Sequence, residues 1–369
     1  MRISYRILGC LLIAFGQAAI AEAQLAIEYP VPTAVRGDFL ALLDRPRVLL
    51  DPQPSIEPAE NRDKPDDLAV TERLTIATER KADGTLERIP ILLMRPQGNK
   101  GRLPVVVVLH GTGGNKEGQQ DWLRRLVRNN MIGVAIDARY HGQRSGGANR
   151  AEAYVAAITR AWETKPGEAQ EHPFFYDTVW DLWRLLDYIE QRPDVDRERI
   201  GMIGFSMGGI ETWLAAAVDQ RVRVAIPAIS VQSLRWSLDH DRWQGRARTI
   251  AAAHEAAARE LGEPEINARV CRALWNKVIP GMLEQFDGPS MIRLFADRPL
   301  LILNGEDDPN CPLEGAQLAF DAARSAYRKA DAEDRLQIDV AKGVAHKVTD
   351  EQHQLALDWL VRWLKPAQN

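Results

Sequence analysis

A short glycine-rich turn, Gly204-Phe205-Ser206-Met207-Gly208-Gly209, is the feature that most restricts what this chain can fold into. The apolar run before it, residues 199–205, is typical of a strand, and residues 208–218 after it are rich in helix formers. The chain must therefore turn sharply at Ser206, with glycine where the two elements nearly touch. Such a turn projects the serine hydroxyl above the sheet, which makes Ser206 a candidate nucleophile.

Strand-like and helix-like segments alternate along most of the chain. Residues 103–109 form a continuous β-branched run, typical of a strand buried on both faces of a parallel sheet. An antiparallel pair, 74–78 and 89–94, is predicted at the sheet edge. Further strands are predicted at 131–137, 222–229, 300–304 and 336–341, and helices at 116–130, 177–191, 314–329 and 349–364. The alternation predicts an α/β fold, with a mostly parallel sheet and helices on both faces.

Two long segments, residues 143–175 and 231–296, interrupt this alternation. Each leaves the carboxyl end of a predicted strand, where ligands bind in open α/β sheets. We therefore expect both insertions to cover the site as a cap. The three tryptophans of the second insertion either line the pocket or pack the cap onto the core. These are Trp236, Trp243 and Trp275.

The region before the main domain divides into two parts. Residues 1–23 have the pattern of an export signal: Arg2 and Arg6, a mostly apolar run, and Ala21-Glu22-Ala23 as a cleavage site. We expect a periplasmic or extracellular protein with no stable membrane span after signal removal. A lipoprotein is disfavoured because Cys10 precedes the apolar core. Residues 24–69 are rich in proline and predict an extended arm laid over the main domain, residues 70–369.

Composition narrows the function classes. A chain of 369 residues with 45% hydrophobic and 27% charged residues is globular and large enough for an α/β domain with insertions. The net charge is -4, and no cluster of basic residues marks a nucleic-acid face, so no nucleic-acid partner is expected. The seven histidines include no zinc motif, and we predict no metal and no cofactor. The oligomeric state stays open, as does a disulfide between Cys271 and Cys311.

The partners that a serine nucleophile needs follow later in the chain. An imidazole must remove the serine proton, and a carboxylate must hold that imidazole. After the strand at 300–304, Asp308 is the preferred acid and Asp307 the competitor, although both could simply shape an Asp-Pro turn. His346 follows the last predicted strand and is the candidate base, because Ser, Asp and His each come just beyond a strand. His353, inside the final helix, is the weaker candidate.

A glycine-rich loop, His110-Gly111-Thr112-Gly113-Gly114, follows the buried strand at 103–109. The backbone N–H groups of Thr112 and Met207 are the expected donors to the oxyanion of a tetrahedral intermediate. A phosphate loop is rejected, because neither Gly-Lys-Ser/Thr nor Gly-x-Gly-x-x-Gly is present. Candidate pocket residues are His110, Gly111 and Tyr140; His141 and Arg144 either join them or pack within the loop.

Taken together, the motifs resemble those of the α/β-hydrolase superfamily over nearly all of the chain after the export signal. The matching segments are the His-Gly loop at 110–114, the elbow at 204–208, Gly-x-x-Asp-x-x-x-Pro at 305–312 and Gly-x-x-His at 343–346. Within that superfamily, the chain resembles the dienelactone hydrolase-like, acetyl xylan esterase-like and prolyl oligopeptidase-like branch. It is also similar to uncharacterised hydrolases with segments like Tyr140-His141-Gly142, Phe174-Phe175-Tyr176-Asp177 and Asp181-Leu182-Trp183.

Two departures from that branch bear on function. A dienelactone hydrolase would be expected to carry a cysteine nucleophile where this chain has Ser206, and an oligopeptidase would add a β-propeller, for which the N-terminal region is too short. The resemblance therefore implies a serine hydrolase, specifically a carboxylic ester hydrolase with a Ser-His-Asp acyl-enzyme mechanism, acting on a small-molecule or saccharide ester. The export signal adds that the enzyme is secreted. An exported serine peptidase or amidase is the first alternative. A hydrolase-fold binding protein without turnover is the second.

Overall fold

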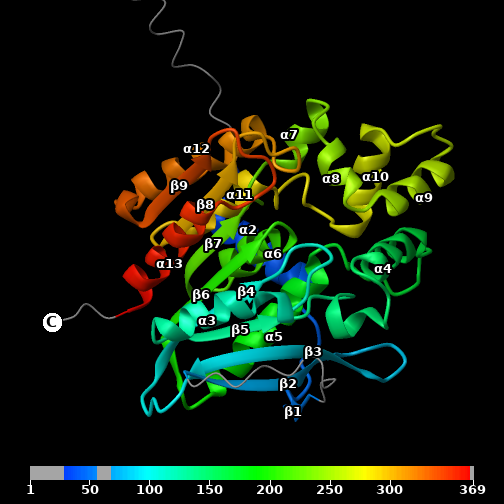
Figure 1. The fold of residues 1–369 in the computed structure, drawn as a ribbon. Helices are drawn as coiled ribbons and strands as arrows, with labels where there is room; N and C mark the ends of the chain where they lie inside the picture. Colours follow the sequence, from blue (N-terminus) through cyan, green and yellow to red (C-terminus); the bar gives the residue numbers. More distant parts are fainter. Residues whose placement is uncertain (1–28, 56–67, 366–369) are drawn as a thin grey trace, which may run out of the picture.

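One nine-stranded sheet organises the protein, seen in a computed structural model that describes residues 29–55 and 68–365 (Figure 1). The predicted export signal lies outside the described residues. The strand order is β1-β2-β3-β5-β4-β6-β7-β8-β9. Pairs from β1 to β5 are antiparallel, and pairs from β5 to β9 are parallel. The strands are β1 Gln53–Pro54, β2 Ala69–Arg80, β3 Leu86–Pro96, β4 Leu103–Leu109, β5 Ile132–Ile136, β6 Val195–Phe205, β7 Val222–Ala228, β8 Leu300–Gly305 and β9 Leu336–Ala341.

Helices cover both faces of the sheet, which explains why every residue of β4 is buried. Val106 and Val108 face a core shared with α3 (Gln120–Arg128) and α13 (Asp350–Leu364). Val105 and Val107 face the other core, which includes side chains of four further helices. These are α2 Pro32–Leu43, α5 Tyr176–Gln191, α6 Met207–Val218 and α12 Leu313–Lys329. The predicted α/β fold, with a mostly parallel sheet and helices on both faces, is confirmed.

The N-terminal arm differs from the prediction, because Pro32–Leu43 is a helix rather than an extended segment. Proline at the first helical position costs no hydrogen bond, since the first N–H groups of a helix have no partner within it. Val35, Phe39 and Leu43 recur every four residues and are buried in the core. Phe39 packs edge-on against Tyr176, with ring centroids 5.4 Å apart. Through these contacts, this helix packs on the main domain.

The two insertions supply a group of helices that projects to one side of the sheet (Figure 1). In the first insertion, α4 (Glu152–Glu163) packs against α9 (Ala251–Leu261) and α10 (Ala268–Val278) of the second. The second insertion also contains α7 Leu234–Asp239, α8 Gln244–Arg248 and α11 Gly288–Ile292. Here α11 packs on α6 and α12 and so belongs to the core. Residues 234–278 and α4 therefore form the part that we call the cap.

Two of the three tryptophans of the second insertion pack against histidines of the cap. Trp275 is fully buried and donates its Nε1–H to His254 Nε2 at 3.0 Å, while Trp236 stacks on His240.

The sequence left open whether Cys271 and Cys311 form a disulfide. In the structure, both are buried free thiols. Burial raises the pKa of Cys271 to about 12. Neither thiol is therefore positioned or ionised as a nucleophile.

The acid stability of the cap depends on His254. Its Nδ1–H donates to Ile250 O and its Nε2 accepts from Trp275, so the native cap holds the neutral imidazole, and burial lowers the His254 pKa to about 4. Unfolded histidine titrates near 6.5, so this contribution is complete above that pH and is lost as pH falls from 6.5 through 4. Its full size is about 3 kcal/mol.

We expect His254→Gln to be less sensitive to acid than the native protein. The difference in the free energy of unfolding between the two should shrink by about 2 kcal/mol between pH 7.5 and pH 4.5, measured by urea denaturation. His240→Gln, at an exposed position of the same cap, is the control and should track the native protein. Parallel pH profiles for native protein and His254→Gln would contradict the assignment.

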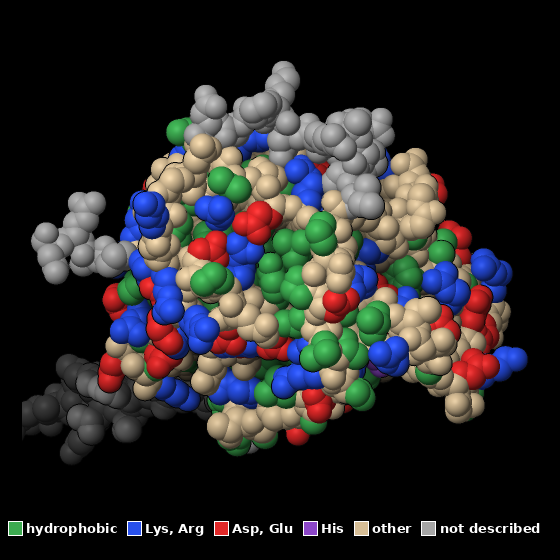
Figure 2. Space-filling model, turned by 90° about the horizontal axis from the view of Figure 1, so that it is seen from below, with side chains coloured by type: hydrophobic (Ala, Val, Ile, Leu, Met, Phe, Trp, Pro, Cys, Tyr) green, Lys and Arg blue, Asp and Glu red, His purple; other side chains and the backbone are tan. Residues whose placement is uncertain are grey.

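The surface gives two further observations. On the face seen from below, Lys and Arg side chains alternate with Asp and Glu around a strip of hydrophobic side chains (Figure 2). Among the described residues visible on this face, the basic side chains form no continuous field of the kind that binds nucleic acid. Within residues 29–55 and 68–365, no helix is both long and apolar enough to cross a bilayer.

Candidate active site

Ser206 lies at a strained turn between β6 and α6. Its backbone has φ 55° and ψ -112°, a region that residues with a side chain rarely adopt. A Cβ on Gly204 would lie 2.0 Å from the carbonyl oxygen of Gly208, and one on Gly208 would lie 2.6 Å from that of His110. Both positions therefore require glycine. Ser206 N donates to Ala228 O of β7 at 2.9 Å, which fixes the turn to the neighbouring strand.

Three of the predicted site residues meet at the carboxyl edge of the sheet. His346 follows β9, and its Nε2 lies 2.7 Å from Ser206 Oγ. Asp308 follows β8, and its Oδ2 lies 2.7 Å from His346 Nδ1. The Asp308 side chain is fully buried, and His346 is largely covered. The structure thus brings together three side chains that lie far apart in the sequence.

The hydrogen bonds at Asp308 decide between it and Asp307. Asp308 Oδ1 accepts from the N–H groups of Asn310 and Cys311, at 2.8 and 3.1 Å, which leaves Oδ2 for His346. The side chain of Asp307 is exposed, and its N–H donates to Val344 O at 2.9 Å. Asp308 therefore faces the histidine, whereas the Asp307 side chain faces solvent.

These contacts require a particular protonation pattern in His346. A carboxylate accepts hydrogen bonds only, so Nδ1 must carry the proton that faces Asp308. The lone pair of Nε2 then faces Ser206 Oγ and accepts from its hydroxyl. This is the arrangement in which imidazole can remove a serine proton and carry the resulting charge beside a carboxylate. His353, the weaker candidate, packs with its ring tilted against Trp122 and Phe205, and Ser206 Oγ is bound by His346 instead.

His110 is a buried support for the glycine-rich loop. Its Nδ1–H donates to Gly111 O at 2.8 Å, and its Nε2 accepts from Ala138 N at 3.2 Å. Both bonds need the neutral ring, and burial lowers the His110 pKa in agreement with this. A Cβ on Gly111 would lie 3.5 Å from the Ser206 Cβ, so the loop passes directly beside the serine.

The two predicted oxyanion donors lie close to Ser206. Met207 is the first residue of α6, where N–H groups have no partner within the helix. Thr112 follows Gly111 in the loop beside the serine and is half-buried. The N-terminal end of α6 also carries a partial positive charge that favours a developing oxyanion.

The side chains of the other predicted pocket residues are held by hydrogen bonds, burial or ion pairs. Tyr140 donates its hydroxyl to Glu171 at 2.8 Å, and burial together with Glu171 raises its pKa. His141 is buried, and burial lowers its pKa to about 3. Arg144 pairs with Glu87 and Asp181. Arg144 is therefore held by ion pairs to β3 and α5, outside its own loop, and His141 is held by burial.

Two buried ion pairs near the site were not predicted from the sequence. Asp137, at the end of β5, accepts from the Lys116 backbone at 2.8 Å and its Nζ at 3.2 Å. A Cβ on Gly142 would lie 2.3 Å from the Asp137 carboxyl carbon, so this acid fixes the turn after β5. Arg139 pairs with Asp181, joining two segments that resemble uncharacterised hydrolases. The sequence did contain a signal for the role of Asp137, because this acidic residue comes directly after a buried strand.

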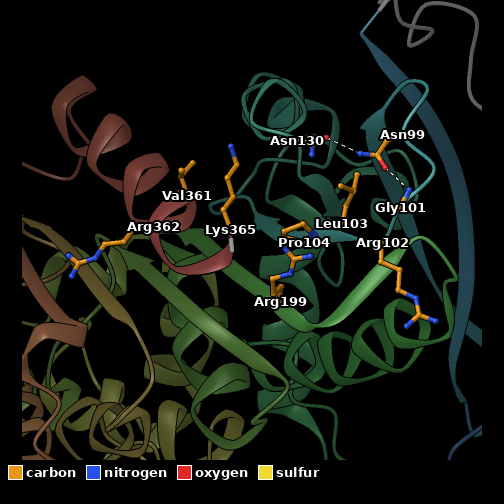
Figure 3. Close-up of a pocket in the computed structure, with 10 residues that line it drawn as sticks. All are labelled: Asn99, Gly101, Arg102, Leu103, Pro104, Asn130, Arg199, Val361, Arg362 and Lys365. Atoms are coloured by element: carbon orange, nitrogen blue, oxygen red, sulfur yellow. Dashed lines mark hydrogen bonds between the residues drawn. The ribbon is translucent and has the colours of Figure 1, made fainter. Parts of the chain in front are cut away.

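A cavity of about 820 Å³ lies at the opposite edge of the sheet (Figure 3). Its wall includes Pro104 near the start of β4 and Arg199 of β6, with Lys365 beyond the end of α13. Figure 3 shows the head groups of Arg102 and Arg362 pointing away from each other. This cavity is remote from Ser206. In the described part of the chain, no three His, Cys, Asp or Glu side chains are placed to hold a metal ion.

Comparisons with known proteins agree with this architecture. Residues 79–233 match the family model described as acetyl xylan esterase. The acetyl xylan esterase from Paenibacillus sp. R4 superposes with a TM-score of 0.60 at 21% identity, over 90% of this chain and 92% of that chain. Acetyl xylan esterase 1 from Thermoanaerobacterium sp. JW/SL YS485 gives a TM-score of 0.61 at 19% identity, over 90% and 94%.

Among curated sequences, "Putative hydrolase YtaP" of Bacillus subtilis (strain 168) is 25% identical over 291 residues, covering 75% of this chain and 84% of that protein. The solved structures establish the α/β-hydrolase fold, and the family match confirms the predicted likeness to the acetyl xylan esterase-like branch. The matched segment contains Thr112, Ser206 and Met207 but ends before Asp308 and His346.

Proposed function

We propose that this α/β-hydrolase, matched to acetyl xylan esterases over residues 79–233, is a serine esterase that acts through an acyl-enzyme. The observation that carries the proposal is the continuous hydrogen-bonded chain from Ser206 Oγ through His346 to Asp308, with both contacts at 2.7 Å. Each of these side chains is held by the end of a different strand. Preorganisation of this kind is what an activated serine requires.

In the proposed reaction, Ser206 Oγ attacks the ester carbonyl carbon while His346 Nε2 takes the hydroxyl proton. The N–H groups of Met207 and Thr112 bind the carbonyl oxygen as it becomes an oxyanion. His346 then gives its proton to the leaving alcohol, and the acyl group stays on Ser206. A water molecule, deprotonated by His346, releases the acid and restores the enzyme. Asp308 stabilises the imidazolium in both halves without taking the proton.

For the substrate, we propose an acetyl ester of a saccharide or a small alcohol. Support comes from the acetyl xylan esterase match and from the two solved structures of that name. We also retain the proposal of export, which depends on residues 1–23 of the sequence. No contact in the described structure specifically favours an amide substrate.

A substrate panel tests this function. The purified protein is given 4-nitrophenyl esters from acetate to octanoate, acetylated xylan oligosaccharides, and amino-acyl 4-nitroanilides. We expect kcat/KM to be highest for acetyl esters and at least about 100-fold lower for the anilides. Faster anilide than ester hydrolysis would favour the peptidase or amidase alternative. No hydrolysis, together with no labelling of Ser206 by a fluorophosphonate that labels a control esterase, would favour the non-catalytic alternative.

A further inference from the structure

One buried arginine of the cap, Arg246 in α8, has no carboxylate partner in the described part of the chain. Three arginines there are buried, and Arg139 and Arg184 each form an ion pair. Arg246 is 3% exposed, yet its Nη2 reaches only Asn310 O at 3.3 Å and Cys311 Sγ at 3.7 Å. Its Nε is buried without a hydrogen-bond partner. Because an arginine side chain stays charged in proteins, this arrangement favours an anionic ligand.

Arg246 is fixed next to the proposed catalytic residues by its neighbour Gly245. A Cβ on Gly245 would lie 2.0 Å from Pro309 O, so α8 rests directly on the turn that begins at Asp308. Cys311, in the same turn, donates its thiol hydrogen to Ile229 O at 3.3 Å. Ile229 directly follows β7, the strand that accepts a hydrogen bond from Ser206 N. The guanidinium therefore lies beside the triad but outside ion-pair distance of Asp308, whose Oδ2 is bound to His346.

A second unpartnered polar group comes from the first insertion. Tyr154 of α4 is 1% exposed, and its hydroxyl proton has no acceptor among the described residues. Burial and nearby Glu211 raise the Tyr154 pKa while Arg246 lowers it, which places the guanidinium within electrostatic range of this hydroxyl. Burial raises the pKa of Glu211 well above its usual range, and Glu211 forms no ion pair with Arg246 in the described part of the chain.

The two insertions thus bring two buried donors close to the proposed catalytic residues. Arg246 contacts the turn that begins at Asp308, and the Tyr154 ring centroid lies 4.7 Å from that of His141, which lies 5.1 Å from that of His110. We propose that Arg246 and Tyr154 bind a carboxylate carried by the ester substrate, close to the scissile bond. This inference rests on the proposed esterase function and narrows its substrate to acidic esters. A guanidinium and a phenol together offer the fork and the extra donor that a carboxylate accepts well.

Two matched substrate pairs test the proposal and locate the carboxylate. The first compares 4-nitrophenyl hemisuccinate with 4-nitrophenyl butyrate, which differ by a carboxylate on the acyl side. The second compares 4-acetoxybenzoate with phenyl acetate, which differ by a carboxylate on the alcohol side. In at least one pair, we expect Arg246→Met to lower the acidic-to-neutral ratio of kcat/KM by about 10- to 100-fold, while the neutral ester changes by less than about 3-fold.

Variants separate binding from folding. Arg246→Lys should restore part of the preference, and Tyr154→Phe should lower it by a smaller factor of about 5. Because Arg246 lacks an ion pair, Arg246→Met should leave the unfolding temperature unchanged or raise it. The control is Arg298→Met, because the Arg298 guanidinium binds backbone carbonyls such as Ala216 O and Val222 O. That variant should unfold at lower temperature and keep the native substrate ratio.

A binding measurement decides the case even if the protein hydrolyses no ester. Succinate is titrated into Ser206→Ala by calorimetry, with Ser206→Ala/Arg246→Met as the comparison. We expect binding to the first and a loss of at least about 10-fold in affinity for the second. The inference is overturned if neither substrate pair shows an Arg246-dependent preference and succinate binds both variants equally or neither. Hydrolysis of neutral esters in that case would leave the proposed esterase function intact.

Discussion

Replacing Ser206 with alanine is expected to lower kcat for 4-nitrophenyl acetate by at least about 10⁴-fold, with the fold retained. The hydroxyl that His346 Nε2 contacts at 2.7 Å is the only group of the three that can form the acyl-enzyme. Alanine keeps the Cβ and therefore the same backbone strain at φ 55°. We expect the free energy of unfolding to change by less than about 1 kcal/mol, because one partly exposed hydrogen bond is lost.

The measurement is the initial rate of nitrophenol release, combined with urea denaturation of both proteins. Ser290→Ala is the control, since it removes the same hydroxyl from a buried serine in α11 of the core. It should keep at least about half of the native rate. More than a tenth of native activity in Ser206→Ala, in a preparation free of other esterases, would show that Ser206 is not the nucleophile.

The parts of the site that lie at strand ends could be predicted from the sequence, because parallel topology fixes where such ends meet. Ser206 and His346 were predicted in this way, and the structure brings them into contact. The sequence left Asp307 as a competitor of Asp308, because both acids follow the end of the same strand and topology does not separate adjacent residues. The choice is set by the N–H groups of Asn310 and Cys311, which orient the Asp308 carboxylate.

Other features depend on contacts that no local pattern encodes. Nothing in the sequence around Arg246 distinguishes it from the chain's many exposed arginines. Its burial follows from the close approach of Gly245 to Pro309, more than sixty positions later. The helix Pro32–Leu43 did have a signal, since Val35, Phe39 and Leu43 are spaced by four, but the frequent prolines favoured an extended arm. In both cases tertiary packing decided the outcome.

Replacing Asp308 with asparagine is expected to lower kcat by about 10⁴-fold while leaving the turn intact. The asparagine Oδ1 can still accept from Asn310 and Cys311, so the local fold persists. Its amide, however, would donate to His346 Nδ1, which then needs its proton on Nε2. In that tautomer Nε2 faces Ser206 with a proton instead of a lone pair and cannot act as the base.

Asp307→Asn is a closely matched control, because it makes the same change of charge one residue away on an exposed side chain. We expect kcat/KM for 4-nitrophenyl acetate to change by less than about 2-fold in this variant, since a solvent-exposed charge is well screened. Nitrogen-15 NMR of the histidine ring should show Nδ1 protonated in the native protein and in Asp307→Asn, and Nε2 protonated in Asp308→Asn. A greater loss of activity in Asp307→Asn than in Asp308→Asn would assign the orienting acid to Asp307, whereas equal small losses would mean that neither carboxylate controls the tautomer of His346.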